Sequence, residues 1–436
     1  MKSESNTQPN HPQKLPESNS DNKNSEEIRV LHLDTETGLR GGEKQMLYVI
    51  QKNSKFQTEE SAKDNIQIES GHSRHRSQLS NSEPPKDGTR PIRYYFAGQP
   101  SGKAIEAARP HCTVFPLKMT GGADVFAAKK LASICKRYRI DIVDAQTSNA
   151  HSTALLAKLF GGKFQLIVHR RVDNVPSSSF INRLKYGSSL VDQYVCISNA
   201  IAKIMTDFGI SEQKIGTVPS AVESAYMHSS FESKKDEKRK VAAHFEIPTN
   251  KVWCICAGAF TEQKGHETLI KAWAALNEEV RKGAILLLAG DGPLLEEHKR
   301  LAGELSVAGS IHFLGWQRSV DSLLYASDIY TMPSNWEGLG TVFLSAGLCL
   351  LPSIATRVGG IPEVIDHEKT GYLVEVKDVQ GFARHLEQLI EDKETTKKMA
   401  HQARAKVKRD FSLQAMIEGN ESIYRKLCSI SNKTSL

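Results

Sequence analysis

Short apolar runs rich in β-branched and aromatic residues alternate along most of the chain with longer segments of helical periodicity. Such runs predict β-strands, and they lie at 29–33, 92–98, 112–117, 141–146, 165–170, 194–198, 252–259, 284–290, 311–315, 329–334 and 372–376. Strands that alternate with helices of ~10 or more residues form βαβ units with parallel strands and right-handed crossovers. The pattern therefore predicts an α/β fold.

Three polar segments interrupt this pattern. Residues 1–27 are rich in Ser, Asn, Lys, Glu and Pro, and we expect a disordered tail because so few apolar side chains cannot offset the entropy of ordering. The same composition at 54–90 predicts a long polar loop inserted into the first series of strands. The highly charged stretch at 221–248 separates the two series and predicts a linker.

These boundaries divide the chain into two doubly wound α/β domains, at 28–220 and 249–410, and a C-terminal helix at 411–436. We expect this helix to pack back toward the first domain. Two domains also suit a chain of 436 residues, because single cores stop growing near ~250 to 300 residues. Ligands of doubly wound sheets bind beyond the carboxyl ends of the strands, so the residues that follow the predicted strands are the candidate site.

Composition narrows the class of protein. No apolar run approaches the ~20 residues of a membrane span, and the first 27 residues lack the apolar stretch of a secretory signal, so we expect a cytoplasmic protein. Seven scattered cysteines without metal-ligand spacing are expected to be reduced core residues. The net charge of +7 suits sugar nucleotides or an anionic membrane surface. Aromatic residues do not interleave with a basic stripe, which argues against nucleic acid.

The first candidate motif is the glycine pair Gly41 and Gly42, which follows the predicted strand 29–33 and precedes a helical segment. Glycines at a helix N-terminus let an anion approach bare amides and the positive end of the helix dipole. A tight turn with no ligand would need the same residues. The segment lacks the full GxGxxG fingerprint, so a nicotinamide cofactor is not indicated.

The second motif, GAFTEQKGH at 258–266, follows the first strand of the second domain. Lys264 stands just before a glycine turn, where its ammonium group can neutralise a diphosphate. A solvated loop lysine would show the same pattern. The turn GDGP at 290–293 is equally ambiguous, because two glycines and a proline form a turn whether or not a ligand binds.

The third motif, NWEGLG at 335–340, follows the predicted strand 329–334 and precedes an apolar helix. Glu337 can accept hydrogen bonds from sugar hydroxyls. Backbone amides for a diphosphate would come from Gly338, Leu339, Gly340 and Thr341. The alternative is that Glu337 only complements the helix dipole.

Taken together, these segments resemble the retaining glycosyltransferases of family four, which have the GT-B fold. The matching pieces are LHLDTETGLRGGEKQML, YVCISNAIAKIM, GAFTEQKGHETLIKAW, LLLAGDGPL, FLGW, ASDIYTMPSNWEGLGTVFLSAG and ATRVGGIPEVI, in that order. The resemblance implies two Rossmann-like domains that face each other across a cleft. It also implies transfer of a sugar from a nucleotide-sugar donor with retention of anomeric configuration and without a metal or other cofactor.

The resemblance also implies roles for residues. Lys264 corresponds to the lysine that contacts the donor diphosphate, and Glu337 to the glutamate that contacts the donor sugar, so these two are the candidate catalytic residues. The loop with Gly41 and Gly42 corresponds to one that approaches the reaction centre from the opposite domain.

Two positions depart from the family pattern. Ala259 stands where an arginine usually flanks the diphosphate, and Ser345 stands where a second carboxylate usually binds the ribose. A hydroxyl should bind the ribose about 1 to 2 kcal/mol less strongly than a carboxylate. Thr341 and Ser345 are four residues apart on a predicted helix, so both hydroxyls are expected to face the ribose.

The acceptor and the transferred sugar are expected at residues 141–174. His151 begins a predicted helix, where it is either a polar contact or a capping or solvated side chain. His169, Arg170 and Arg171 follow the predicted strand 165–170, and arginines there suit phosphate or anionic acceptors. An ion pair with Asp173 is the alternative.

The sequence thus predicts a hexosyltransferase-like enzyme that uses a UDP- or GDP-linked sugar and a glycan or lipid-linked acceptor. Synthesis of cell-envelope polysaccharide or lipopolysaccharide, at the inner face of the membrane, fits the basic charge and the family. A nucleotide-sugar 2-epimerase is a second hypothesis. A third hypothesis is a catalytically silent binding subunit. It is favoured by Ser345 and Ala259, which depart from the family pattern, and opposed by Lys264 and Glu337, which match it.

Overall fold

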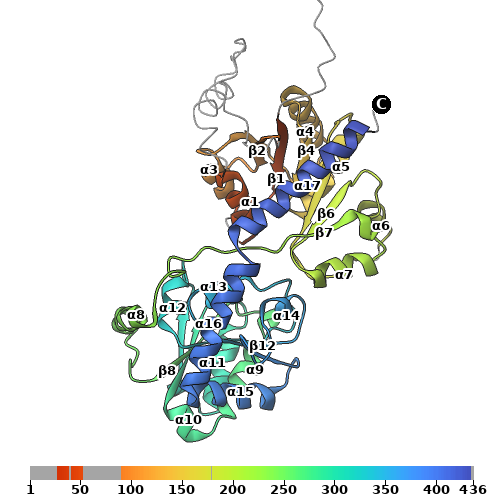
Figure 1. Cartoon of the computed structure of the whole chain (residues 1–436). Coiled ribbons are helices and arrows are strands. Elements are labelled where there is room, and N and C mark those ends of the chain that lie inside the picture. The colour runs from red at the N-terminus through yellow and green to blue at the C-terminus, as the bar shows by residue number, and fades with distance from the viewer. Residues whose placement is uncertain (1–26, 39–40, 53–89, 178, 434–436) are drawn as a thin grey trace, which may run out of the picture.

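The computed structural model describes residues 27–38, 41–52, 90–177 and 179–433. It consists of two α/β domains, each built on a parallel sheet (Figure 1). The predicted fold class, with two doubly wound Rossmann-like domains, is confirmed. The expected tail at 1–27 and the expected insertion at 54–90 lie almost wholly outside the described residues and stay predictions.

The first sheet has the order β3-β2-β1-β4-β5-β6-β7. Its strands are β1 (Ile28–Leu33), β2 (Ile92–Gly98), β3 (Thr113–Pro116), β4 (Ile142–Ala145), β5 (Gln165–Arg170), β6 (Gln193–Cys196) and β7 (Ile215–Thr217). Its helices are α1 (Gly41–Lys52), α3 (Lys103–Ala108), α4 (Val125–Tyr138), α5 (Ser148–Leu159), α6 (Phe180–Tyr186) and α7 (Asn199–Asp207).

The second sheet has the order β10-β9-β8-β11-β12-β13. Its strands are β8 (Val252–Ala257), β9 (Ala284–Ala289), β10 (Ile311–Gly315), β11 (Ile329–Met332), β12 (Ser353–Thr356) and β13 (Gly371–Val374). The helices that follow β7 are α8 (Phe231–Phe245), α9 (His266–Ala274), α10 (Glu278–Lys282), α11 (Leu295–Glu304), α12 (Asp321–Ala326), α13 (Thr341–Leu348), α14 (Ile361–Val364), α15 (Val379–Glu391), α16 (Lys393–Asp410) and α17 (Leu413–Lys433).

The direction of strand addition reverses once in each sheet, between β1 and β4 in the first and between β8 and β11 in the second. At such a reversal the connections leave toward opposite faces of the sheet, and the crevice between them is the usual ligand site of a doubly wound fold. The loops that follow β1, β4, β8 and β11 are therefore the places where a site is expected.

Both faces of the first sheet are buried. Along β1, Val30 packs in the apolar cluster that includes α1, α3 and α17, whereas Leu31 packs in the cluster that includes α4 and α5. Successive strand residues point to opposite faces, so a parallel strand covered by helices on both sides reads as a continuous apolar run. This explains why the periodicity of the sequence located most of the strands.

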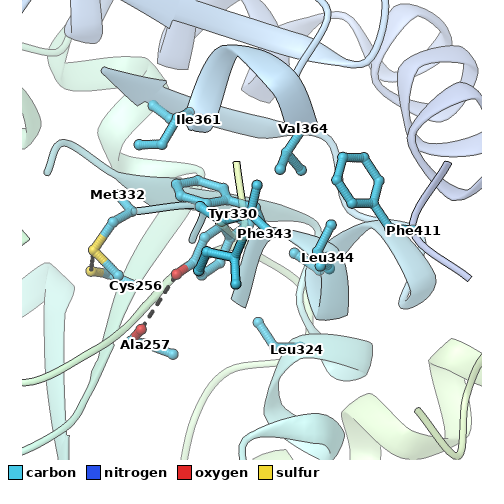
Figure 2. Packing of buried hydrophobic residues seen from close by; sticks show 14 of the residues in the cluster. Cys256, Ala257, Leu324, Tyr330, Met332, Phe343, Leu344, Ile361, Val364 and Phe411 are labelled. Atoms are coloured by element: carbon cyan, nitrogen blue, oxygen red, sulfur yellow. Dashed lines mark hydrogen bonds between the residues drawn. The ribbon is translucent and has the colours of Figure 1, made fainter. Parts of the chain in front are cut away.

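The core beneath α13 fixes the position of that helix (Figure 2). Phe343 of α13 meets Tyr330 of β11 edge-on, with ring centroids 5.1 Å apart. The Tyr330 hydroxyl donates a 3.3 Å hydrogen bond to the carbonyl oxygen of Ala257 at the end of β8. Tyr330 is fully buried. The start of α13 and the ends of β8 and β11 thus share one packed core.

Much of the segment expected to be a linker is the helix α8, which packs against the second domain. Lys234 is buried, and its ammonium group donates 3.3 Å hydrogen bonds to the carbonyl oxygens of Cys349 and Leu350, just after α13. Lys238 pairs with Asp328 at 2.7 Å. Some of the charged residues of this segment are therefore lysines that bind carbonyl oxygens at a helix end or a carboxylate, and others are solvated.

The C-terminal helices divide between the domains. Helix α16 packs against α13 and α15 of the second domain, and α17 returns to the first domain and packs on β1 and α1 (Figure 1). All seven cysteines are buried and free. Among the described residues, no helix is both long and apolar enough to cross a bilayer.

Candidate functional site

Lys264 and Glu337 form an ion pair in the second domain. Lys264 ends the short 3-10 helix at Glu262–Lys264, in the loop after β8, and Glu337 lies in the loop after β11. Strands β8 and β11 are neighbours in the sheet, so parallel pairing brings both loops to the same edge. The side chains are 19% and 13% exposed, which leaves the pair partly open to a ligand.

Hydrogen bonds join the two loops that carry this pair. The Asn335 amide donates to the Gln263 carbonyl oxygen at 2.8 Å, and the Gln263 side-chain amide donates to the Trp336 carbonyl oxygen at 3.2 Å. Gly265 has φ +65°, and a Cβ there would lie 2.0 Å from the Pro333 carbonyl oxygen. Only glycine fits this turn, so its place beside Lys264 in the sequence has a steric cause.

The start of α13 provides unbonded amides next to Glu337. Gly340 precedes the helix in the left-handed region, at φ +78°, and no side chain caps the helix. The first amides of a helix have no partner within it, so those near Thr341 are available to an anion. The Leu339 side chain is buried, so its backbone alone can contact a donor. Ser345 is half-buried one turn after Thr341, as the expected pair of hydroxyls requires.

The first domain contributes a loop that reaches this site. Gly42 lies in the first turn of α1, and a Cβ there would be 3.3 Å from Arg171 Cδ. A Cβ on Gly338 would be 2.9 Å from the Arg171 carbonyl oxygen. Arg171 also donates a 2.8 Å hydrogen bond to Gln146, which follows β4. The structure thus brings together Gly42, Arg171 and Gly338, from sequence positions far apart.

Asp173 belongs to the same loop, and the sequence predicts no role for it beyond an ion pair with the arginines. Burial raises the pKa of Asp173, the nearby charge of Glu337 raises it further, and Lys264 lowers it. These interactions place its carboxyl group in the electrostatic field of the Lys264–Glu337 pair. No spacing in the sequence links Asp173 to that pair.

His169 takes part in a buried polar network in place of the expected contact with an acceptor. Its Nε2 lies 3.2 Å from the Asp144 carboxylate, His32 Nδ1 lies 3.3 Å from the same carboxylate, and the Tyr424 hydroxyl donates to it at 2.7 Å. Burial raises the pKa of Asp144, but the two histidines outweigh burial and hold that pKa well below its usual range. The adjoining cavity of about 10 Å³ has room for one water molecule.

His151 and Arg170 also point inward, contrary to expectation. His151 is fully buried on α5, and its ring meets Tyr186 and Tyr194 edge-on. Burial lowers the pKa of His151 to about 3, so the ring is neutral. Arg170 is buried, donates hydrogen bonds to Asn174 and lies over the Tyr186 ring. His151 thus packs α5 against α6 and β6, and Arg170, at the end of β5, holds the loop before α6.

Contacts between the domains include residues that the sequence reasoning did not select. The Ser198 hydroxyl donates to the Gly338 carbonyl oxygen at 2.8 Å. The Glu363 carboxylate accepts from the backbone amides of Asn199 and Ala200, each at 3.0 Å, and so caps α7 of the other domain. Ser198 lies in YVCISNAIAKIM and Glu363 in ATRVGGIPEVI, so the resemblance marked both segments without assigning these contacts.

No group of three or more histidine, cysteine, aspartate and glutamate side chains among the described residues is arranged to hold a metal ion. The site that the structure assembles consists of a lysine, a carboxylate, helix-start amides and an arginine-bearing loop from the opposite domain. A cation and bare amides can bind a diphosphate, and a carboxylate can orient sugar hydroxyls.

Comparison with known proteins gives the family of the chain. The family model described as Glycosyl transferases group 1 matches residues 237–406, and the model Glycosyltransferase Family 4 matches residues 89–226. Over 307 residues the chain is 31% identical to N-acetyl-alpha-D-glucosaminyl L-malate synthase of Bacillus anthracis, covering 69% of this chain and 78% of that protein. It is 32% identical over 176 residues to the lipopolysaccharide core biosynthesis glycosyltransferase LpsE of Rhizobium meliloti, covering 40% of this chain and 50% of that protein.

Solved structures share the fold. Anabaena Alr3699/HepE in complex with UDP and glucose superposes with a TM-score of 0.70 at 17% identity and covers 92% of this chain and 100% of that one. A glycosyltransferase from Rickettsia africae superposes with a TM-score of 0.71 at 20% identity and covers 92% and 98%. The chain therefore belongs to glycosyltransferase family 4 and is a glycosyltransferase of the GT-B fold.

Proposed function

We propose that this glycosyltransferase moves a sugar from a UDP- or GDP-linked donor to a glycan or lipid-linked acceptor of the cell envelope, with retention of configuration. The observation that carries the proposal is the Lys264–Glu337 pair beside the uncapped start of α13, at the strand reversal of the second sheet. Two relatives support the wider context, since one is named for lipopolysaccharide core biosynthesis and another is a UDP-Gal:alpha-D-GlcNAc-diphosphoundecaprenol galactosyltransferase of Escherichia coli.

On this proposal the donor binds the second domain. Lys264 exchanges part of its contact with Glu337 for the diphosphate, and the amides near Thr341 bind the same group. Glu337 then accepts hydrogen bonds from the sugar. Negative charge that develops on the leaving diphosphate meets a cation and fixed dipoles, which stabilise it without reorganisation. We propose that this arrangement works without a metal ion.

The acceptor approaches from the first domain. The Arg171 side chain lies against Gly42 and donates to Gln146, and its backbone carbonyl oxygen lies against Gly338, so the loop that carries it reaches the second domain. Asp173, on the same loop, lies in the field of the Lys264–Glu337 pair. The acceptor hydroxyl attacks from the face that the diphosphate leaves, and the leaving phosphate accepts its proton. We assign no protein side chain as the general base.

A screen of UDP- and GDP-linked sugars against cell-envelope extracts tests the proposal, with products identified by mass spectrometry and anomeric configuration by NMR. Transfer with retention that persists in EDTA is the expected result. Inversion of configuration, or loss of transfer in EDTA with recovery on adding a divalent cation, would overturn those parts. Isomerised nucleotide sugar without an acceptor would indicate the epimerase, and absence of donor binding in calorimetry would indicate a silent subunit.

A further inference from the structure

One carboxylate of the second domain binds the start of a helix in the first domain. Glu363 lies in α14, and its carboxylate accepts hydrogen bonds from the backbone amides of Asn199 and Ala200, each at 3.0 Å, and from the Asn199 side-chain amide at 3.1 Å. Asn199 and Ala200 begin α7, and α7 and α14 lie at the facing edges of the two domains (Figure 1). The first amides of a helix have no partner within it and lie at the positive end of its dipole. A carboxylate from the other domain therefore satisfies two of these amides in α7.

The third amide of α7 is capped within the first domain, and the residue that caps it also reaches the second domain. The Ser198 hydroxyl accepts a 3.2 Å hydrogen bond from the Ile201 amide and donates to the Gly338 carbonyl oxygen at 2.8 Å. Ser198 and Ile201 are fully buried, and a Cβ on Gly338 would lie 3.3 Å from Ile201 Cδ1. The start of α7 is thus packed on Gly338, and the half-buried Glu363 carboxylate binds it beside this contact.

The turn that leads into α14 holds the backbone of Glu337. The Gly360 amide donates to the Glu337 carbonyl oxygen at 3.2 Å. A Cβ on Gly359 would lie 1.7 Å from the same oxygen. A Cβ on Gly360 would lie 2.4 Å from the Gly338 carbonyl oxygen and 2.9 Å from Ser198 Cβ. These backbone segments touch with no side chain between them, so a shift of the turn is transmitted to Glu337.

Both sets of contacts are made by one short segment. Helix α14 has four residues, and the Glu363 amide donates to the Gly360 carbonyl oxygen at 3.0 Å, so the carboxylate and the turn move together. Glu363 binds the first domain, and Gly360 binds Glu337. We propose that Glu363 is a positioning residue for sugar transfer, which joins the domains at α7 and sets the place of Glu337 relative to the first domain. This inference rests on the proposed function, which assigns Glu337 to the donor sugar.

The chemistry of the contact predicts how variants of Glu363 rank in turnover. Glutamine keeps an oxygen that accepts one amide but loses the charge, alanine loses both, and lysine places a cation at the positive end of α7. Turnover of the nucleotide sugar selected by the screen, measured as release of UDP or GDP, should fall from wild type through Glu363→Gln and Glu363→Ala to Glu363→Lys. Glu363→Ala should be at least about tenfold slower than the wild type, because a misplaced sugar-orienting group slows the chemical step.

Calorimetric titration with UDP and GDP separates positioning from a general loss of structure. Affinity for the free nucleotide should be unchanged in Glu363→Ala, because the diphosphate is assigned to Lys264 and the start of α13. Glu387→Ala is the matched control, since the Glu387 carboxylate on α15 accepts the backbone amide of Asn277 within the second domain. The control should change neither turnover nor affinity. Equal losses of turnover and affinity in Glu363→Ala would mean that Glu363 only stabilises the second domain and would overturn the inference.

Distances between the domains test the contact without any substrate. Lys203 on α7 and Glu394 on α16 have side chains that are 75% and 87% exposed, and the seven native cysteines are buried, so spin labels can be attached to Lys203→Cys and Glu394→Cys. The distribution of label distances, measured by double electron–electron resonance, should broaden in Glu363→Ala and stay unchanged in Glu387→Ala. An unchanged distribution in Glu363→Ala, or full turnover in Glu363→Lys, would overturn the inference. Absence of UDP and GDP binding in the wild type would contradict the proposed function, whereas the distance distributions alone decide whether Glu363 joins the domains.

Discussion

Replacing Lys264 by alanine removes the cation of the Lys264–Glu337 pair and, on our proposal, a contact with the donor diphosphate. A hydrogen bond to a charged group contributes about 1.5–3 kcal/mol, and about 1.4 kcal/mol changes an equilibrium constant tenfold. We therefore expect the variant to bind nucleoside diphosphate about ten- to hundredfold more weakly, with donor turnover reduced at least tenfold.

The same substitution should also affect stability, because it leaves Glu337 without its partner. The two side chains are 19% and 13% exposed. This exposure places the pair between surface pairs, which contribute ~0–1 kcal/mol, and fully buried pairs, whose disruption costs ~3–5 kcal/mol. We expect Lys264→Ala to lower the free energy of unfolding by about 1–2 kcal/mol. Lys264→Ala combined with Glu337→Gln should recover most of that loss but none of the nucleotide affinity.

Calorimetric titration with UDP and GDP and thermal unfolding of the free protein measure the two effects separately. Lys271→Ala is a matched control, because Lys271 lies nearby on α9 and pairs with Glu267 at 2.6 Å at the surface. It should change neither quantity appreciably. Unchanged nucleotide affinity in Lys264→Ala would refute the assignment of this lysine to the diphosphate. A double variant no more stable than the single one would refute the estimate for the ion pair.

Four other substitutions test particular contacts. Glu337→Gln should lower turnover more than affinity for free nucleotide, since its contact is with the sugar; equal losses in kinetics and calorimetry would contradict this. Ser345→Glu should tighten donor binding by about 1–2 kcal/mol, whereas weaker binding in a titration beside Ser345→Ala would mean that the side chain packs elsewhere. The melting temperature of the wild type should fall between pH 6.5 and 5, because the pKa of His151 is lowered to about 3 in the native state and only the unfolded chain takes up a proton there. His151→Leu should make this fall smaller. An unchanged pH profile would exclude His151 as its cause. Tyr424→Phe should lower the free energy of unfolding by about 1.5–3 kcal/mol, as its hydroxyl bonds a buried carboxylate, and an unchanged denaturation midpoint would argue against the network.

The amino-acid sequence predicted the fold class and named Lys264 and Glu337 separately as candidate site residues. Buried parallel strands read as apolar runs separated by amphipathic helices, so periodicity located most strands to within two residues at each end. Lys264 and Glu337 each follow such a run, and strands that flank the reversal of a doubly wound sheet end side by side. The order of the strands, which only the structure gives, places β8 beside β11 and brings the two residues together.

Elements with weak local signals needed the tertiary structure. Strands β7 and β12 are three and four residues long and gain their hydrogen bonds only from neighbours in the sheet. Helix α8 is strongly charged, and its place became clear only because Lys234 and Lys238 bind carbonyl oxygens and a carboxylate of the second domain. A pattern of charge along the chain does not show which charges will find partners.

The direction of side chains at strand ends was decided only in three dimensions. His169, Arg170 and Arg171 are consecutive, yet the structure directs the first side chain to Asp144, the second to Asn174 and Tyr186, and the third to Gly42 and Gln146. Likewise, nothing near Tyr424 in the sequence marks its bond to Asp144, 280 residues away. Spacing in the sequence fixes which residues lie close along one helix or strand. Contacts between distant segments depend instead on how the helices and sheets pack. In this protein that packing decided which polar groups are structural and which face the site.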